Sequence, residues 1–201
     1  MGSMSLTQIL VTSFLVAFTG ALAPGPITAI TMRHGVRLGP PAGLAVSVGH
    51  GLVELAMLWV LVLGLGKLLV LPQATAVIAA LGAVVLAWMA WGAFSEARQG
   101  TAGFAAGVSV VDTKAHRRNT RFIALLPVMM AGVAATITNP YWMLWWATIG
   151  ANYVLLAQTQ GITGLGVFFT GHIAADIFCF VLFAAMASTG ERLLGQKFYK
   201  G

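Results

Sequence analysis

Residues 49–54 read Gly-His-Gly-Leu-Val-Glu, and residues 171–176 read Gly-His-Ile-Ala-Ala-Asp. Both stretches follow the pattern Gly-His-x-x-x-acid, and both lie inside long apolar segments, where an imidazole and a carboxylate are costly to bury. In a helix, residues four positions apart lie on the same face. The chain has four histidines and five acidic residues, and the repeated pattern uses two of each. We therefore interpret the two pairs as the polar centre of a duplicated protein: His50, Glu54, His172 and Asp176.

The composition is that of a membrane protein. Of the 201 residues, 59% are hydrophobic and 8% are charged, and the mean hydropathy is +0.90. A water-soluble domain carries roughly 25% charged residues. Several apolar stretches of this chain reach the ~20 residues that cross a bilayer as a helix. The sequence therefore predicts an all-α, polytopic integral membrane protein whose surroundings are the lipid bilayer.

Several other classes of protein and site are excluded by the sequence. The single cysteine, Cys179, excludes an intrachain disulfide and a cysteine-rich metal site. The net charge of +6 comes from residues that flank apolar segments, so we expect no nucleic-acid partner. The chain lacks the H-E-x-x-H pattern of metalloproteases and the nucleophile elbow of hydrolases, so it is not expected to be an enzyme. No cofactor is expected either.

Two of the apolar segments contain prolines that must break or kink a helix. The first helix, from Leu6, is interrupted at Pro24-Gly25-Pro26, and the second helix, from about Gly43, carries the first His–acid pair. The fourth helix is expected to open at Pro127 and to break at Asn139-Pro140, and the fifth, residues 161–189, carries the second pair.

Each half of the chain therefore has a proline-broken helix followed by a His–acid helix, and the two halves enter the membrane from opposite sides. Such an inverted-topology repeat is found in many secondary transporters. Three helices in the first repeat predict a sixth helix beyond Gly201; a protein of five helices is the alternative. The expected divisions are 1–5, a tag remnant and the N-terminus; 6–95, the first repeat with three transmembrane helices; 96–121, a loop; 122–190, the second repeat with two; and 191–201, a basic tail.

The distribution of positive charge predicts the orientation. If the N-terminus lies outside, the first loop, the long loop and the tail all face the cytoplasm. These segments hold ten of the eleven Lys and Arg residues and leave Lys67 outside, in agreement with the positive-inside rule. We therefore expect a multi-pass protein of the inner (plasma) membrane whose long loop is cytoplasmic.

The two helix breaks form the predicted solute site. A broken helix leaves N–H and C=O groups unpaired at membrane depth, which is tolerated where protein or a wet cavity satisfies them. The half-helices after the breaks direct the positive ends of their dipoles inward, where they favour an anion such as a carboxylate. A packed proline kink without a ligand is the structural alternative. The predicted solute contacts are Pro24, Gly25, Pro26, Thr28, Asn139, Pro140 and Trp142.

The two His–acid pairs have three interpretations. A carboxylate beside an imidazole can exchange a proton near neutral pH, which suits a proton-coupled exporter. Two imidazoles and two carboxylates also form a four-ligand set for Zn²⁺, Mn²⁺ or Cd²⁺, so His50, Glu54, His172 and Asp176 are candidate metal ligands of a divalent-cation exporter. In the third interpretation they are hydrogen bonds that pin helices together in a structural membrane protein without transport.

With these residues in view, the chain resembles the lysine exporter (LysE/RhtB) family of efflux permeases. The resemblance is carried by Leu22-Ala23-Pro24-Gly25-Pro26, by Arg33-His34-Gly35 with Gly39, by Gly43 and Gly49, and by Asn139-Pro140. It implies a six-helix secondary transporter, homodimeric and proton-coupled, that exports an amino acid or a similar small metabolite. Typical members continue Asn-Pro with Lys, whereas this chain has Tyr141.

Overall fold

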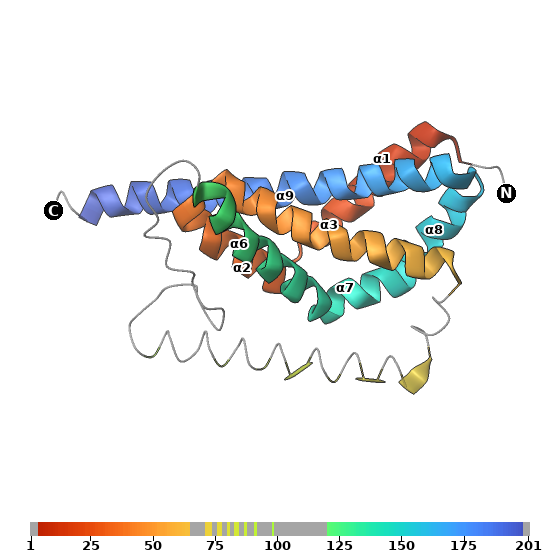
Figure 1. Ribbon diagram of the computed structural model, residues 1–201, viewed down its shortest axis with the longest axis horizontal. Coiled ribbons are helices and arrows are strands. Elements are labelled where there is room, and N and C mark those ends of the chain that lie inside the picture. The colour runs from red at the N-terminus through yellow and green to blue at the C-terminus, as the bar shows by residue number, and fades with distance from the viewer. Residues whose placement is uncertain are drawn as a thin grey trace.

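The computed structural model describes residues 4–64 and 120–198, together with isolated positions between residues 71 and 98. Every regular element in the two continuous ranges is helical, as the sequence predicts (Figure 1). In chain order these are α1 (Leu6–Ala21), α2 (Pro26–Leu38), α3 (Pro40–Val62), α6 (Thr120–Ile137), α7 (Pro140–Trp145), the π-helical turn η1 (Trp146–Gly150), α8 (Ala151–Gln158) and α9 (Gly161–Phe198).

The first broken helix consists of α1 and α2, whose axes differ by 78°. Ser5 caps α1 because its hydroxyl accepts from the backbone N–H of Gln8, whose side chain in turn accepts from the N–H of Ser5. Pro26 occupies the first helical position of α2, where a missing N–H costs nothing. The predicted interruption at Pro24-Gly25-Pro26 is therefore confirmed.

The helices that carry the His–acid pairs, α3 and α9, are long and apolar enough to cross a bilayer. They run in opposite directions (Figure 1). α3 begins at Pro40, three residues before the predicted start at Gly43, because Gly39 turns the chain at φ 67° and Pro40 opens the helix. α9 continues to Phe198, beyond the predicted end at residue 189.

The second broken helix consists of α6 and α7, and the break at Asn139-Pro140 is confirmed. The Asn139 side chain accepts from the N–H of Tyr141 and so caps α7. The prediction that Pro127 opens this helix is wrong, because α6 begins at Thr120 and contains Pro127. Proline is tolerated inside a membrane helix where neighbouring groups satisfy the backbone carbonyl that it frees.

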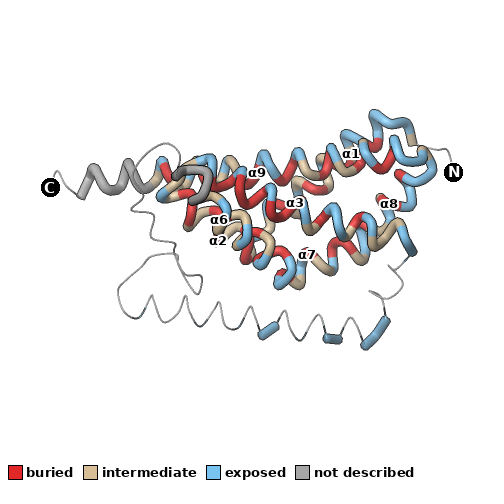
Figure 2. The backbone as a smooth tube through the Cα atoms, viewed as in Figure 1, coloured by how far each residue is buried: buried red, intermediate tan, exposed pale blue. Residues whose placement is uncertain are grey.

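The two halves of the chain interlock in the described bundle. The first broken helix packs on α9 of the second half, whereas α3 of the first half packs on α6 and α9. Buried residues line the inward faces of the helices (Figure 2). Large apolar side chains such as Leu15, Leu52 and Met186 are exposed. An apolar exterior around a core that contains charged residues is the arrangement of a polytopic helical membrane protein.

Two predicted features fall outside the described residues. They are the third helix of the first repeat, expected after Pro72, and nearly all of the loop at residues 96–121. The order of the described helices nevertheless places a broken helix before a His–acid helix twice, with the second unit reversed relative to the first (Figure 1).

Glycines allow α3 to lie directly against its neighbours. A Cβ atom on Gly132 of α6 would lie 2.8 Å from the carbonyl oxygen of Val46, and a Cβ atom on Gly49 would collide with the carbonyl oxygen of Met129. Helix pairs in membranes commonly use such small residues to bring backbones together. These contacts fix the distance between α3 and α6.

We predict that Gly49→Ala destabilises the protein, because either α6 must move away or the added methyl group must overlap its backbone. Overpacking of this kind costs about 1–3 kcal/mol. Gly166→Ala is the matched control, since no atom lies within 4 Å of a Cβ atom at that position on α9. Thermal unfolding of detergent-solubilised protein checks this; equal midpoints for the two variants would contradict the described packing.

Candidate functional site

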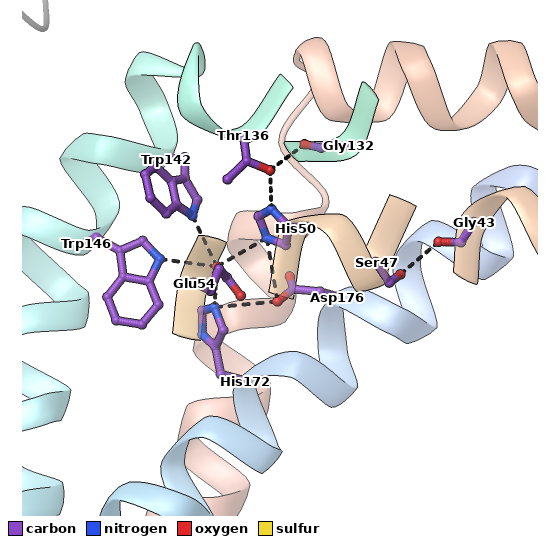
Figure 3. A network of polar contacts seen from close by, with 10 residues as sticks. All are labelled: Gly43, Ser47, His50, Glu54, Gly132, Thr136, Trp142, Trp146, His172 and Asp176. Carbon is purple, nitrogen blue, oxygen red and sulfur yellow. Dashed lines mark hydrogen bonds and ion pairs between the residues drawn. The ribbon is translucent and has the colours of Figure 1, made fainter. Parts of the chain in front are cut away.

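The two His–acid pairs meet at one place in the middle of the bundle (Figure 3). His172 Nε2 lies 2.9 Å from Glu54 Oε1 and 3.4 Å from Asp176 Oδ2. His50 Nε2 lies 3.1 Å from Glu54 Oε1 and 3.9 Å from Asp176 Oδ2. All four residues are at most 4% exposed. We call these four residues the polar centre.

Glu54 Oε1 is the acceptor on which the polar centre converges. The indole N–H groups of Trp142 and Trp146 donate to it at 3.2 and 3.1 Å. Because an indole N–H can donate but not accept, these two contacts fix Oε1 as an acceptor. His172 from α9 approaches the same oxygen, so this single atom joins α3 to the second half of the chain.

The orientation of His50 is set by Thr136 of α6. The Thr136 hydroxyl lies 2.8 Å from the carbonyl oxygen of Gly132 and 2.8 Å from His50 Nδ1. The carbonyl can only accept, so the Thr136 hydroxyl donates its single proton to Gly132. The proton between the hydroxyl oxygen and His50 Nδ1 must therefore belong to Nδ1. His50 therefore donates through Nδ1 and directs Nε2 towards the two carboxylates.

A cavity adjoins the polar centre and reaches both helix breaks. About 60 Å³ of it is open to the centres of water-sized molecules, so it holds a few waters in this conformation. The two breaks approach each other there, since a Cβ atom on Gly25 would lie 3.9 Å from Asn139 Nδ2. Of the predicted site residues, those that line the cavity are Pro24, Gly25, Thr28, Asn139, Trp142, His50, Glu54, His172 and Asp176.

Two of the predicted solute contacts are not lining residues. Pro26 and Pro140 instead occupy the first turn of α2 and of α7, where they start the half-helices. Thr28 lines the cavity, but its hydroxyl donates to the carbonyl oxygen of Ala23 and so satisfies one group freed by the first break. Trp142 likewise commits its N–H to Glu54.

The sequence interpretation missed Trp145. This residue lines the cavity and is 7% exposed, and its indole N–H has no hydrogen-bond partner in the described part of the chain. The i, i+3, i+4 spacing of Trp142, Trp145 and Trp146 puts all three on one helix face. Spacing alone could not show which indole N–H groups donate to Glu54 and which one is left without a partner.

The polar centre also has acceptor atoms with unused capacity. Glu54 Oε2 and Asp176 Oδ2 are buried and have no hydrogen-bond partner among the described residues. His50, Glu54 and Asp176 each offer a ligand atom, and these atoms lie within 4.8 Å of one another. The polar centre can therefore accept a proton, an ammonium group or a metal cation.

We predict that Trp142→Phe destabilises the protein more than Trp145→Phe. The two indoles are equally exposed, at 7%, but the first donates to a carboxylate and the second has no partner. A hydrogen bond to a charged group contributes about 1.5–3 kcal/mol, which is the expected difference between the two variants. Reversible unfolding in mixed micelles measures it, and an equal loss in both variants would refute the assignment of the indole donors.

The model of a family described as LysE type translocator matches residues 18–200, which is nearly the whole chain. No curated protein and no solved structure matches the chain significantly.

Proposed function

This chain belongs to the LysE type translocator family, and we propose that it exports an amino acid or a related small metabolite by proton-coupled alternating access. Membership of this family makes the protein a membrane transporter of the exporter type rather than an enzyme. The substrate class and the coupling to protons are our proposals, and the polar centre beside the cavity is the observation that carries them.

The chemistry of the cavity supports a zwitterionic solute. The first turn of α2 has backbone N–H groups without intrahelical partners, and the free indole N–H of Trp145 adds another donor for a carboxylate. The unused acceptors are Glu54 Oε2 and Asp176 Oδ2, which suit an ammonium group. An amino acid carries both a carboxylate and an ammonium group.

The polar centre supports coupling to protons. Buried carboxylates must be protonated or paired with a cation, since an uncompensated charge inside a membrane protein is very costly. Histidine exchanges protons in the physiological range, and each carboxylate here has two imidazoles nearby. Uptake of a proton from one side of the membrane and its release on the other would therefore change the charge of the polar centre beside the bound solute.

The arrangement of the helices supports alternating access. The polar centre receives groups from both halves of the chain (Figure 3). Residues of both helix breaks line the cavity. The polar centre lies inside the bundle, so the loading and release of a solute there would require the two halves to move relative to each other. Rocking of one repeat against the other around a fixed site is how inverted repeats work in other transporters.

The charge distribution supports the proposed cellular setting. We place the protein in the inner (plasma) membrane as a multi-pass homodimer, with the N-terminus outside and residues 96–121 in the cytoplasm. The support for this orientation is the position of ten of the eleven Lys and Arg residues. Its partners are then the exported solute and the lipid bilayer.

We predict that Asp176→Asn and Glu54→Gln abolish solute export driven by a pH gradient, because neither amide can take up and release a proton. Solute-for-solute exchange needs no net proton movement, so it should continue, at a reduced rate because an amide oxygen binds the ammonium group of the solute more weakly than a carboxylate does. Proteoliposomes loaded with a radiolabelled amino acid measure both fluxes. A metabolite-resistance screen in an expressing strain selects the amino acid to load.

His34→Gln serves as the control, because His34 is also buried but lies on α2 and does not line the cavity. It should retain both fluxes. Export by Asp176→Asn and Glu54→Gln that follows the pH gradient as in the wild type would refute proton coupling through these carboxylates.

A further inference from the structure

We propose that the polar centre is a binding site for one divalent transition-metal cation of the zinc class. The ligands are His50 Nε2, one oxygen of Glu54 and one oxygen of Asp176. The inference uses the geometry of the polar centre and does not depend on transport. It therefore stands or falls separately from the export function proposed above.

The distances between the ligand atoms suit a small cation. A tetrahedral Zn²⁺ site with bonds of about 2.0–2.2 Å separates neighbouring ligand atoms by roughly 3.3–3.6 Å. His50 Nε2 lies 3.1 Å from Glu54 Oε1 and 3.9 Å from Asp176 Oδ2, which brackets this range. The candidate ligand atoms of the three residues lie within 4.8 Å of one another, so they must draw closer together, and Glu54 must present Oε2, to coordinate one ion.

The surrounding hydrogen bonds hold the ligands in the required orientation. Metal-binding histidines usually donate the N–H of their other nitrogen to a fixed acceptor, which sets the tautomer and directs the lone pair. Thr136 does this for His50, because its hydroxyl accepts from Nδ1 and is itself anchored to Gly132. Nε2 is left facing the two carboxylates (Figure 3).

Glu54 is held in the same way. Trp142, Trp146 and His172 contact Oε1, while Oε2 is buried without a hydrogen-bond partner among the described residues. The carboxylate is thus oriented through one oxygen and has the other available. Asp176 Oδ2 is also buried and without a hydrogen-bond partner in the described ranges, so each acid offers one oxygen to a cation.

Charge and ligand type select the class of ion. Two ionised carboxylates beside neutral imidazoles carry a charge of −2 in a buried site, and a divalent cation neutralises it. A mixed imidazole and carboxylate set suits Zn²⁺ and similar ions, whereas Mg²⁺ prefers octahedral oxygen ligands and retains its waters. Three protein ligands next to a cavity leave a position open for water or for an acceptor group of a solute.

A bound metal would also exclude the proton that couples export. A ligand nitrogen or oxygen must be deprotonated before it can coordinate, so metal and proton compete for the same atoms. Micromolar zinc should therefore inhibit export in the proteoliposome assay described above.

Equilibrium dialysis and calorimetry of the purified full chain with ZnCl₂ test the site. We expect one Zn²⁺ per chain in the wild type, and a visible Co²⁺ absorption spectrum of low coordination number when CoCl₂ replaces zinc. His50→Gln and Asp176→Asn should lose both signals. His34→Gln should keep both, because it removes a buried imidazole outside the polar centre.

If His50→Gln fails to fold, a second pair of variants tests whether the polar centre binds zinc. Thr136→Val removes the acceptor for His50 Nδ1 and should weaken zinc binding about 10–100-fold, the usual loss for an outer partner of a metal ligand. Thr136→Ser keeps the hydroxyl and should restore the affinity. Absence of stoichiometric zinc binding by the wild type, or unchanged affinity in Thr136→Val, would overturn the proposal.

Zinc binding by a protein that exports no tested amino acid would leave this site intact and would refute the proposed export function. Export that is insensitive to zinc, by a protein that binds no zinc, would refute the metal site and leave the proposed export function intact. The two outcomes are therefore distinguishable.

Discussion

The structure depends on how a buried carboxylate inside a membrane protein obtains its hydrogen bonds. Glu54 is 1% exposed, so its carboxylate is shielded from the bulk water that would stabilise a charge. Two indoles and His172, all from the second half of the chain, contact one of its oxygens, which His50 also approaches. The two halves of the chain therefore contact each other at the buried carboxylate, where the loss of these partners would cost the most free energy.

The rest of the fold makes this convergence geometrically possible. Glycines at the crossing of α3 and α6 let the backbones approach closely, and this brings Thr136 to His50. The proline breaks start new helices in the middle of the bundle, so that backbone groups and the tryptophans of α7 face the same cavity as the polar centre. The close packing of α3 on α6 and the two helix breaks thus together position the groups that surround the buried charges of the polar centre.

Much of this organisation could be predicted from the sequence because it rests on local rules. The apolar segments, the two proline breaks and the repeated Gly-His-x-x-x-acid pattern follow from residue type and spacing alone. Pro127 misled the prediction because proline commonly opens a helix, whereas here the bundle tolerates it inside α6.

Apart from the meeting of the two His–acid pairs, the contacts between helices could not be predicted, because they depend on the rotation of each helix about its axis. Thr136 shows no pattern that marks it as the partner of His50, 86 residues away. The same holds for the three tryptophans on one helix face. Two of them donate to Glu54, whereas Trp145 has no partner in the described ranges and lines the cavity.

The interpretation of the molecule as an exporter with a shared polar centre requires Glu54 and His172 to interact directly. A double-mutant cycle with Glu54→Gln and His172→Gln, read as free energies of unfolding in mixed micelles, tests this most directly. We expect a coupling free energy above about 1 kcal/mol, as for residues in one hydrogen-bond network. Effects that add to within about 0.5 kcal/mol, as they do for distant sites, would contradict the account.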